Sequence, residues 1–142
     1  MYSTTRILIL ALAANYQGAS KGTVTHKISW TKPPLHAYKI NTDACFSLNG
    51  EGAAGVVLRN DKGEAVAGGC WPLSNLLDAT TAEALALQKG FMLIEQLGCS
   101  PVTIETDSLE LVQAYNGVID IWSPYTAILV DCCLRLVSLW LM

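Results

Sequence analysis

Residues 38–46, Tyr-Lys-Ile-Asn-Thr-Asp-Ala-Cys-Phe, alternate in the manner of a β-strand, with Ile40 and Thr42 on one face and Asp43 on the other. An aspartate near the end of a strand is unusual because Asp is depleted in strands. A second stretch, Ile104-Glu-Thr-Asp107, ends on the same pattern. The two stretches therefore predict two strands that each carry an acid at the carboxyl end.

Two turn signals connect this first strand to two more strands. Asn49-Gly50 favours a tight turn and leads into a strand expected over residues 53–58. Asn60-Asp-Lys-Gly63 provides the second turn, which leads into a strand expected over residues 64–71. Three successive strands joined by short turns predict an antiparallel meander.

A change to helical periodicity follows the meander. Thr80 and Glu83 match a capping box, which predicts a helix that begins at Thr80 and that Gly98 ends. After it we expect a strand and two helices, in that order, at residues 101–107, 109–115 (capped by Ser108) and 124–139. Three strands, a helix, a strand and two helices predict an α/β protein with a mixed (α+β) sheet and helices packed on it.

Three acidic residues can meet at one edge of this sheet. Open α/β sheets bind ligands at the carboxyl ends of neighbouring strands, where Asp43 and Asp107 are expected to lie. Each acid alone has a simpler explanation, because Asp is a common turn former and Glu83 suits a capping box. However, the aspartates form a matched pair, and Glu83 lies four residues before Leu87, on the helix stripe that faces the sheet. The pattern predicts that the three carboxylates converge.

Such a cluster has the chemistry of a metal site. Converging carboxylates repel one another and need a cation to remain ionised in a partly dry pocket. A ligand set of oxygen atoms, with neither His nor Cys nearby, favours Mg²⁺ or Mn²⁺ over zinc. We therefore expect Asp43, Glu83 and Asp107 to be metal ligands.

The composition is that of a single globular domain. The chain has 142 residues, of which 51% are apolar and 15% charged, and these values exclude a disordered protein. No apolar run reaches the ~18 residues that a membrane helix needs, so we expect no membrane association. Five cysteines without a CxxC pair, mostly inside apolar segments, favour reduced, buried thiols in an intracellular protein of the nucleus or cytoplasm.

Residues 1–28 are expected to form a basic N-terminal segment that precedes one domain over residues 29–142. Residues 1–42 hold five basic side chains and no acid, whereas the rest of the chain has a formal charge of −8. This basic segment can hold a phosphate backbone near the site or be a solvated, flexible arm. Residues 7–14 suit a secretory leader or, as we favour, a short amphipathic helix.

Five fragments of the chain together resemble a known family. They are Trp30-Thr-Lys-Pro-Pro, Lys39-Ile-Asn-Thr-Asp43-Ala-Cys-Phe, Gly55-Val-Val-Leu-Arg59-Asn-Asp-Lys-Gly63, Ala82-Glu83-Ala-Leu-Ala and Ile104-Glu-Thr-Asp107-Ser. In this order they resemble the plant ribonuclease H-like domains related to retrotransposon reverse transcriptases. The resemblance extends over about residues 30–139.

The resemblance implies the ribonuclease H fold, with Asp43 on the first strand, Glu83 on the first long helix and Asp107 at the end of the fourth strand. It also implies hydrolysis of the RNA strand of an RNA/DNA hybrid with two metal ions, Mg²⁺ or Mn²⁺. One ion would activate the attacking water and the other would stabilise the leaving oxygen. The implied partner is an RNA/DNA hybrid, recognised through 2′-hydroxyl contacts.

The chain departs from this family at its C-terminal end. Related domains continue with a fifth strand and a helix that carries a fourth acid, and nothing near Trp140 matches them. We therefore expect an incomplete domain of order βββαβαα, without the final strand and helix. The alternative to an active endonuclease is a catalytically weak or inactive remnant that binds nucleic acid or a partner. Thiol chemistry at Cys132-Cys133 is a third hypothesis, which we do not favour.

Overall fold

A computed structural model of the chain describes residues 7–11, 30–117 and 123–141. Its strands form one sheet and are β1 (Ile7–Ala11), β2 (Tyr38–Phe46), β3 (Gly52–Arg59), β4 (Ala65–Leu73) and β5 (Val102–Thr106). The helices are α1 (Ala79–Leu97), α2 (Leu109–Tyr115) and α3 (Thr126–Leu141). From β2 onward the order of elements is the predicted βββαβαα, and the mixed α+β class is confirmed.

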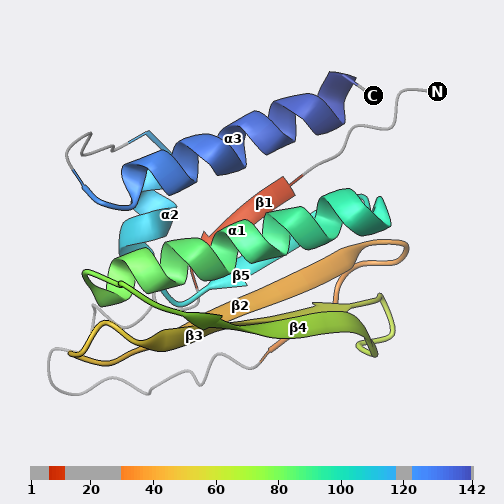
Figure 1. The fold of residues 1–142 in the computed structure, drawn as a ribbon. Helices are drawn as coiled ribbons and strands as arrows, with labels where there is room; N and C mark the ends of the chain where they lie inside the picture. The colour runs from red at the N-terminus through yellow and green to blue at the C-terminus, as the bar shows by residue number, and fades with distance from the viewer. Residues whose placement is uncertain (1–6, 12–29, 118–122, 142) are drawn as a thin grey trace, which may run out of the picture.

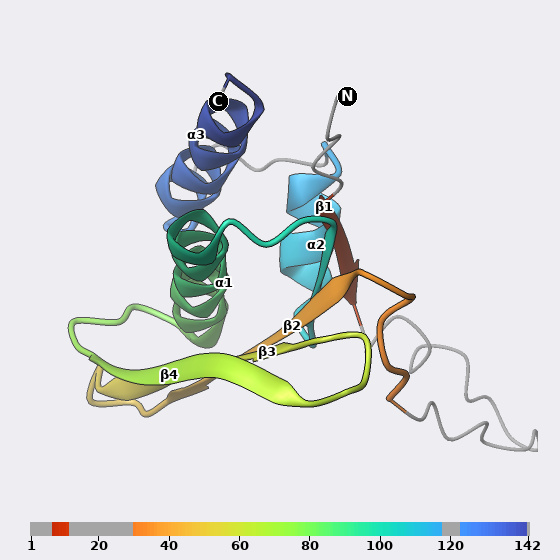
Figure 2. The same cartoon turned by 90° about the vertical axis from the view of Figure 1, so that its right-hand side faces the viewer.

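The sheet has the strand order β1-β5-β2-β3-β4. Strands β2, β3 and β4 pair antiparallel, as the two turn signals predict, whereas β5 runs parallel to β2 and β1 runs parallel to β5. All three helices lie on one face of the sheet (Figures 1 and 2), with α1 against β2 and β3 and with α3 against α1. None of the described helices has the length and apolarity needed to cross a membrane.

The N-terminal strand β1 is the largest departure from the expected elements. Ile7–Ala11 forms neither a helix nor part of a linker but pairs parallel to β5, from Ile7 opposite Val102 to Ala11 opposite Thr106. A short apolar run fits a buried strand as well as a helix by its pattern alone. The deciding factor is tertiary: β5 has a second edge, and β1 supplies the hydrogen bonds that this edge requires. A boundary between residues 28 and 29 remains a prediction.

Helix α1 begins one residue earlier than expected and has a different cap. Asp78, not Thr80, is the N-cap, because the Asp78 Oδ1 accepts a hydrogen bond from the Thr81 N–H at 2.6 Å. The capping-box interpretation is therefore wrong, and Glu83 is left free for another role. The predicted end is confirmed, since Gly98 adopts a left-handed φ of 64° and its N–H donates to the Ile94 carbonyl.

Close packing of α1 on β2 fixes where the helix lies. Phe91 and Ile94 of α1 are buried against Ile40 in the main apolar core. At Gly90 the helix approaches the strand so closely that an added Cβ would lie 3.2 Å from Thr42 Cγ2 and 3.3 Å from Ile40 Cγ2. The glycine thus permits an approach that a larger residue would prevent.

We expect Gly90→Val to destabilise the fold by about 2 kcal/mol, because its extra atoms overfill a packed interface. The matched control is Gln96→Val at an exposed position of the same helix, where we expect a change within about 0.5 kcal/mol. Urea unfolding of both variants measures the difference. Equal effects would show that α1 does not pack as tightly at Gly90 as the distances indicate.

Candidate metal centre

The three predicted acids meet at one place. Asp43 lies near the end of β2, Glu83 in the second turn of α1, and Asp107 directly after β5. Each offers a carboxylate oxygen, and these oxygens all lie within 4.8 Å of one another. Asp43 and Asp107 are exposed, whereas Glu83 is half-buried beneath them. The three residues predicted from the sequence therefore lie together in the structure.

The topology explains this convergence. Strands β2 and β5 are neighbours and run parallel, so their carboxyl ends lie at the same edge of the sheet. Their ladder ends with the pair Asn41 and Glu105, and each aspartate follows two residues later. Because side chains alternate along a strand, Asp43 lies on the same face of the sheet as Asn41.

Backbone hydrogen bonding attaches Glu83 to β2. The Ala44 N–H lies beyond the last residue of β2 that pairs with β5, and it donates to two carboxylates. It lies 2.9 Å from Asp43 Oδ1 and 3.2 Å from Glu83 Oε1. The site therefore satisfies a backbone donor that the ladder leaves unpaired, and this contact orients the Glu83 side chain toward the strand end.

Burial and the repulsion between the carboxylates shift the pKa of Glu83. Burial, followed by repulsion from the carboxylates of Asp107 and Asp43, raises the pKa of Glu83 from 4.5 to about 7, against a smaller lowering by the Ala44 N–H. The second oxygen, Glu83 Oε2, is buried and has no hydrogen-bond partner. A buried acceptor without a donor is costly, and a cation at the cluster would remove both penalties.

The donor set fits a hard divalent cation. Every candidate ligand atom in the cluster is a carboxylate oxygen, and neither a histidine nor a cysteine belongs to it. Mg²⁺ and Mn²⁺ prefer oxygen ligands, and Mg²⁺ is commonly held by one or two carboxylates with water and phosphate in the remaining positions. The exposure of Asp43 and Asp107 leaves room for such additional ligands.

Comparison with known proteins agrees with this arrangement. The model of the reverse transcriptase-like family matches residues 41–138, which is more than half of the chain and includes all three acids. The chain belongs to the reverse transcriptase-like family. A search of curated proteins found no match.

Solved structures identify the fold of this family member as that of ribonuclease H. LC11-RNase H1, isolated from compost by a metagenomic approach, superimposes with a TM-score of 0.65 at 19% identity, over 73% of this chain and 78% of that one. RNase H1 from Halobacterium salinarum gives a TM-score of 0.60 at 22% identity, over 74% and 77% of the two chains. LC11-RNase H1 in complex with an RNA/DNA hybrid gives 0.58 at 19% identity, over 73% and 76%.

Asp131 of this reverse transcriptase-like domain lies outside the cluster. It is in α3, where Asp131 Oδ2 accepts hydrogen bonds at 2.7 Å from both Arg135 Nε and Gln88 Nε2. Arg135 also pairs with Glu95 of α1 at 2.7 Å. These contacts join α1 to α3, so we assign Asp131 to helix packing.

Cys132 of the cysteine pair is not a reactive thiol. Cys132 is buried, and this burial, with the nearby Asp131 carboxylate next in effect, raises the pKa of its thiol to about 12. Such a thiol stays protonated at neutral pH and is a poor nucleophile. The cysteines are free, as expected, but Cys45, Cys70 and Cys133 are exposed and not buried.

The polar groups next to the site were not predicted from the sequence. Lys39 and Glu105 form a buried ion pair next to it, the half-buried Asn41 donates a hydrogen bond to Glu105, and the Ala44 N–H joins β2 to Glu83. Alternation along β2 places Lys39 and Asn41 on the same face as Asp43, and this was the available signal. Alternation along β2 does not show that Glu105 of β5 is the partner of these two residues.

The raised pKa of Glu83 predicts how the stability of the metal-free protein depends on pH. The folded-state pKa exceeds the unfolded value, so the folded state binds the proton more tightly, and stability falls as pH rises from about 4.5 to about 7. Glu83→Gln removes this loss and keeps an acceptor for the Ala44 N–H. After a discount for partial exposure, we expect the variant to gain about 1–2 kcal/mol at pH 8 and almost nothing at pH 4.

Urea unfolding in EDTA at pH 4, 6 and 8 measures this difference between Glu83→Gln and the unsubstituted protein. The control is Glu64→Gln, which removes an exposed acid of the β3–β4 turn outside the cluster and should not reproduce the gain at pH 8. A gain from Glu83→Gln that is the same at every pH would contradict the raised pKa.

Proposed function

We propose that this domain is a metal-dependent endonuclease that hydrolyses the RNA strand of RNA/DNA hybrids. The observation that carries the proposal is the convergence of Asp43, Glu83 and Asp107 within 4.8 Å, together with a buried Glu83 oxygen that lacks a donor. The ribonuclease H fold and the family membership support the same reaction class.

In this proposal the three acids are the ligands of Mg²⁺ or Mn²⁺, as a pair of ions. When bound, the ions supply an activated water and stabilise the charge on the leaving 3′ oxygen. Glu83, with a pKa of about 7, gives up its proton when the cation arrives, so binding weakens as pH falls below 7. Asp43 and Asp107, being exposed, remain accessible to the substrate phosphate.

The proposed partner is an RNA/DNA hybrid, because a structure with the same fold, LC11-RNase H1, was solved in complex with one. A protein can distinguish RNA from DNA through its 2′-hydroxyl groups. We further propose that residues 29–142 are the ribonuclease H-like domain and that the basic segment over residues 1–28 adds strand β1 to its sheet. The free cysteines support a reducing compartment, the nucleus or cytoplasm.

A second candidate function is binding of the hybrid without cleavage. The cluster holds three carboxylates, and Asp131, on the neighbouring helix α3, is bonded to Arg135 and Gln88. A metal position with fewer protein ligands holds its ion less firmly, and such groups act together, so activity can fall far more than affinity. Cleavage assays separate the two candidates.

Removal of the metal ligands should abolish stabilisation by the metal. At a Mn²⁺ concentration ten times the Kd, we expect the protein to gain about 1.4 kcal/mol. Asp43→Asn should lose this gain, because it removes a ligand charge, whereas Glu64→Gln should keep it. Thermal unfolding with Mn²⁺ and with EDTA measures it. Stabilisation that persists in Asp43→Asn would place the bound ion elsewhere.

Cleavage of a 5′-labelled RNA/DNA hybrid in Mg²⁺ or Mn²⁺ tests the proposed reaction. We expect cuts in the RNA strand that EDTA abolishes, and a rate at least ~10²-fold lower in Asp43→Asn, with Glu64→Gln unaffected. Double-stranded DNA of the same sequence is the substrate control.

The outcomes distinguish the candidates. Hybrid binding without cutting, unchanged by Asp43→Asn, would favour the binding remnant. Cutting that survives Asp43→Asn would exclude the carboxylate cluster as the active site.

A further inference from the structure

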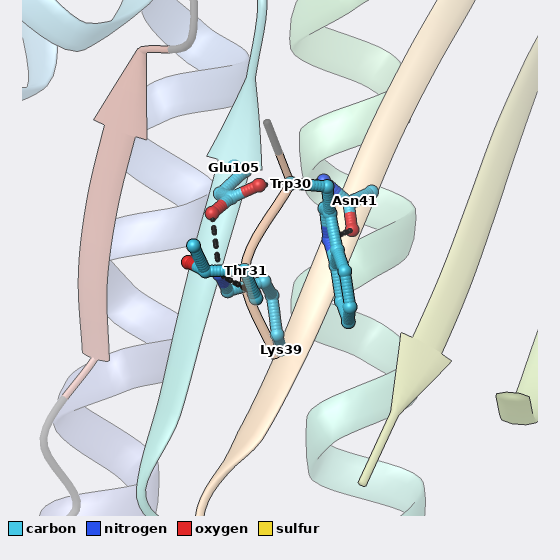
Figure 3. Close-up of polar contacts among 5 residues, drawn as sticks. All are labelled: Trp30, Thr31, Lys39, Asn41 and Glu105. Carbon is cyan, nitrogen blue, oxygen red and sulfur yellow. Dashed lines mark hydrogen bonds and ion pairs between the residues drawn. The ribbon is translucent and has the colours of Figure 1, made fainter. Parts of the chain in front are cut away.

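A polar cluster lies on the face of the sheet opposite the helices. Along β2 and β5 it comes just before the aspartates of the candidate metal centre. Figure 3 views this face, with the helices behind the strands, and labels the five residues of the cluster, Trp30, Thr31, Lys39, Asn41 and Glu105. We call three of them, Lys39, Asn41 and Glu105, the strand clamp. The first two lie on β2 and the third on β5.

The clamp is a buried, hydrogen-bonded ion pair. Lys39 Nζ lies 2.8 Å from Glu105 Oε1, and the two side chains are 7% and 6% exposed. Asn41 Nδ2 donates to the other oxygen, Glu105 Oε2, also at 2.8 Å. Each oxygen of the β5 carboxylate is therefore bound by a different residue of β2, and this fixes both its position and its rotation.

The segment before β2 covers the clamp. Trp30 Nε1 donates to Asn41 Oδ1 at 3.2 Å, and Lys39 Nζ donates to the Thr31 carbonyl. The Trp30 ring has two cations beside it, with Lys39 Nζ 5.2 Å and Arg59 Cζ 5.6 Å from its centroid. These contacts place the segment over Lys39 and Glu105, whose side chains are almost fully buried.

The clamp lies at the point where the two strands part. Asn41 and Glu105 are the last pair of the β2–β5 ladder, and Asp43 and Asp107 each follow two residues later. Beyond this pair the strands have no further paired residues to fix their separation. The Asn41–Glu105 hydrogen bond is thus the last cross-strand contact of the ladder before the two aspartates.

We propose that Lys39, Asn41 and Glu105 are positioning residues for the metal centre, which hold the ends of β2 and β5 at the spacing that brings Asp43 and Asp107 together. This inference rests on the proposed function, since it assigns the clamp to the same site. The Trp30–Thr31 segment keeps the clamp dry and correctly oriented.

Two properties separate this role from ordinary stabilisation. A buried ion pair contributes little to stability compared with apolar residues of similar size, so stability alone does not account for it. Its charges also balance: Lys39 neutralises Glu105, so the clamp adds no net negative charge next to three carboxylates that already repel one another.

The experiment uses the full chain with two clamp variants and one control. Asn41→Ala removes the last cross-strand contact and leaves the ion pair. The double variant Lys39→Met/Glu105→Leu replaces the ion pair by apolar side chains and is expected to fold even if either single change does not. The control is Val57→Ala, an exposed residue of β3 on the same face and directly opposite Asn41.

Two readouts are measured, one of which needs no metal. The first is hydrogen exchange of the Ala44 amide in EDTA by NMR, because this N–H donates hydrogen bonds to Asp43 and Glu83 where β2 and β5 part. We expect it to exchange about fivefold faster in both clamp variants, the factor for losing one typical hydrogen bond. The amides of Leu87 and Phe91 in α1 report global stability and should change less. The second is Mn²⁺ affinity by EPR titration, which should fall about tenfold.

Val57→Ala should leave both readouts unchanged. Unaltered Ala44 exchange in a folded clamp variant would overturn the clamp, as would equal changes at Ala44 and throughout α1, which indicate a purely structural role. If the unsubstituted protein binds no Mn²⁺, the proposed function fails, and the clamp is then judged by Ala44 exchange alone. Faster Ala44 exchange with undiminished Mn²⁺ affinity would likewise overturn the clamp as a support of the metal centre.

Discussion

Three carboxylates within 4.8 Å repel one another, and the fold must supply the free energy that keeps them there. Two rigid contacts do so: the packing of α1 on β2, closest at Gly90, and the parallel ladder between β2 and β5. The remaining electrostatic cost appears at Glu83, whose pKa rises to about 7 because it is the most buried of the three acids. The cluster is thus strained without a cation and would be relieved by one.

The residues of the candidate site could be predicted from the sequence more fully than the contacts that hold them together. The matched strand ends at Asp43 and Asp107 carry the signal because few acids occur in strands, and parallel strands bring their ends to one edge. Glu83 was placed correctly by its distance from Leu87, but its capping interpretation was wrong. Asp78 caps the helix instead, and propensity rules cannot choose between Asp78 and Thr80 when both suit the position.

Other features depend on contacts between distant parts of the chain. Ile7–Ala11 becomes a strand because β5 offers an unpaired edge, which no local pattern shows. Lys39 and Glu105 are charged strand residues, yet they are buried next to the Trp30–Thr31 segment. In both cases the element type or the burial is decided by a partner far along the chain, so local periodicity could not reveal it.

The parallel strands of the sheet contribute the aspartates of the carboxylate cluster, whereas the antiparallel strands β3 and β4 do not. Parallel pairing of β1, β5 and β2 directs their carboxyl ends to one edge, and β5 supplies both Glu105 and the approach to Asp107. Strand β3 runs antiparallel to β2 and therefore begins at that edge, whereas β4 ends there. Neither strand contributes an acid to the cluster. Strand β3 pairs with the other edge of β2 along Lys39–Phe46 and so fixes the part of β2 that carries Asp43 and the Ala44 N–H. The position of the carboxylate cluster therefore follows from strand direction, and the short β2–β5 ladder ends immediately before it.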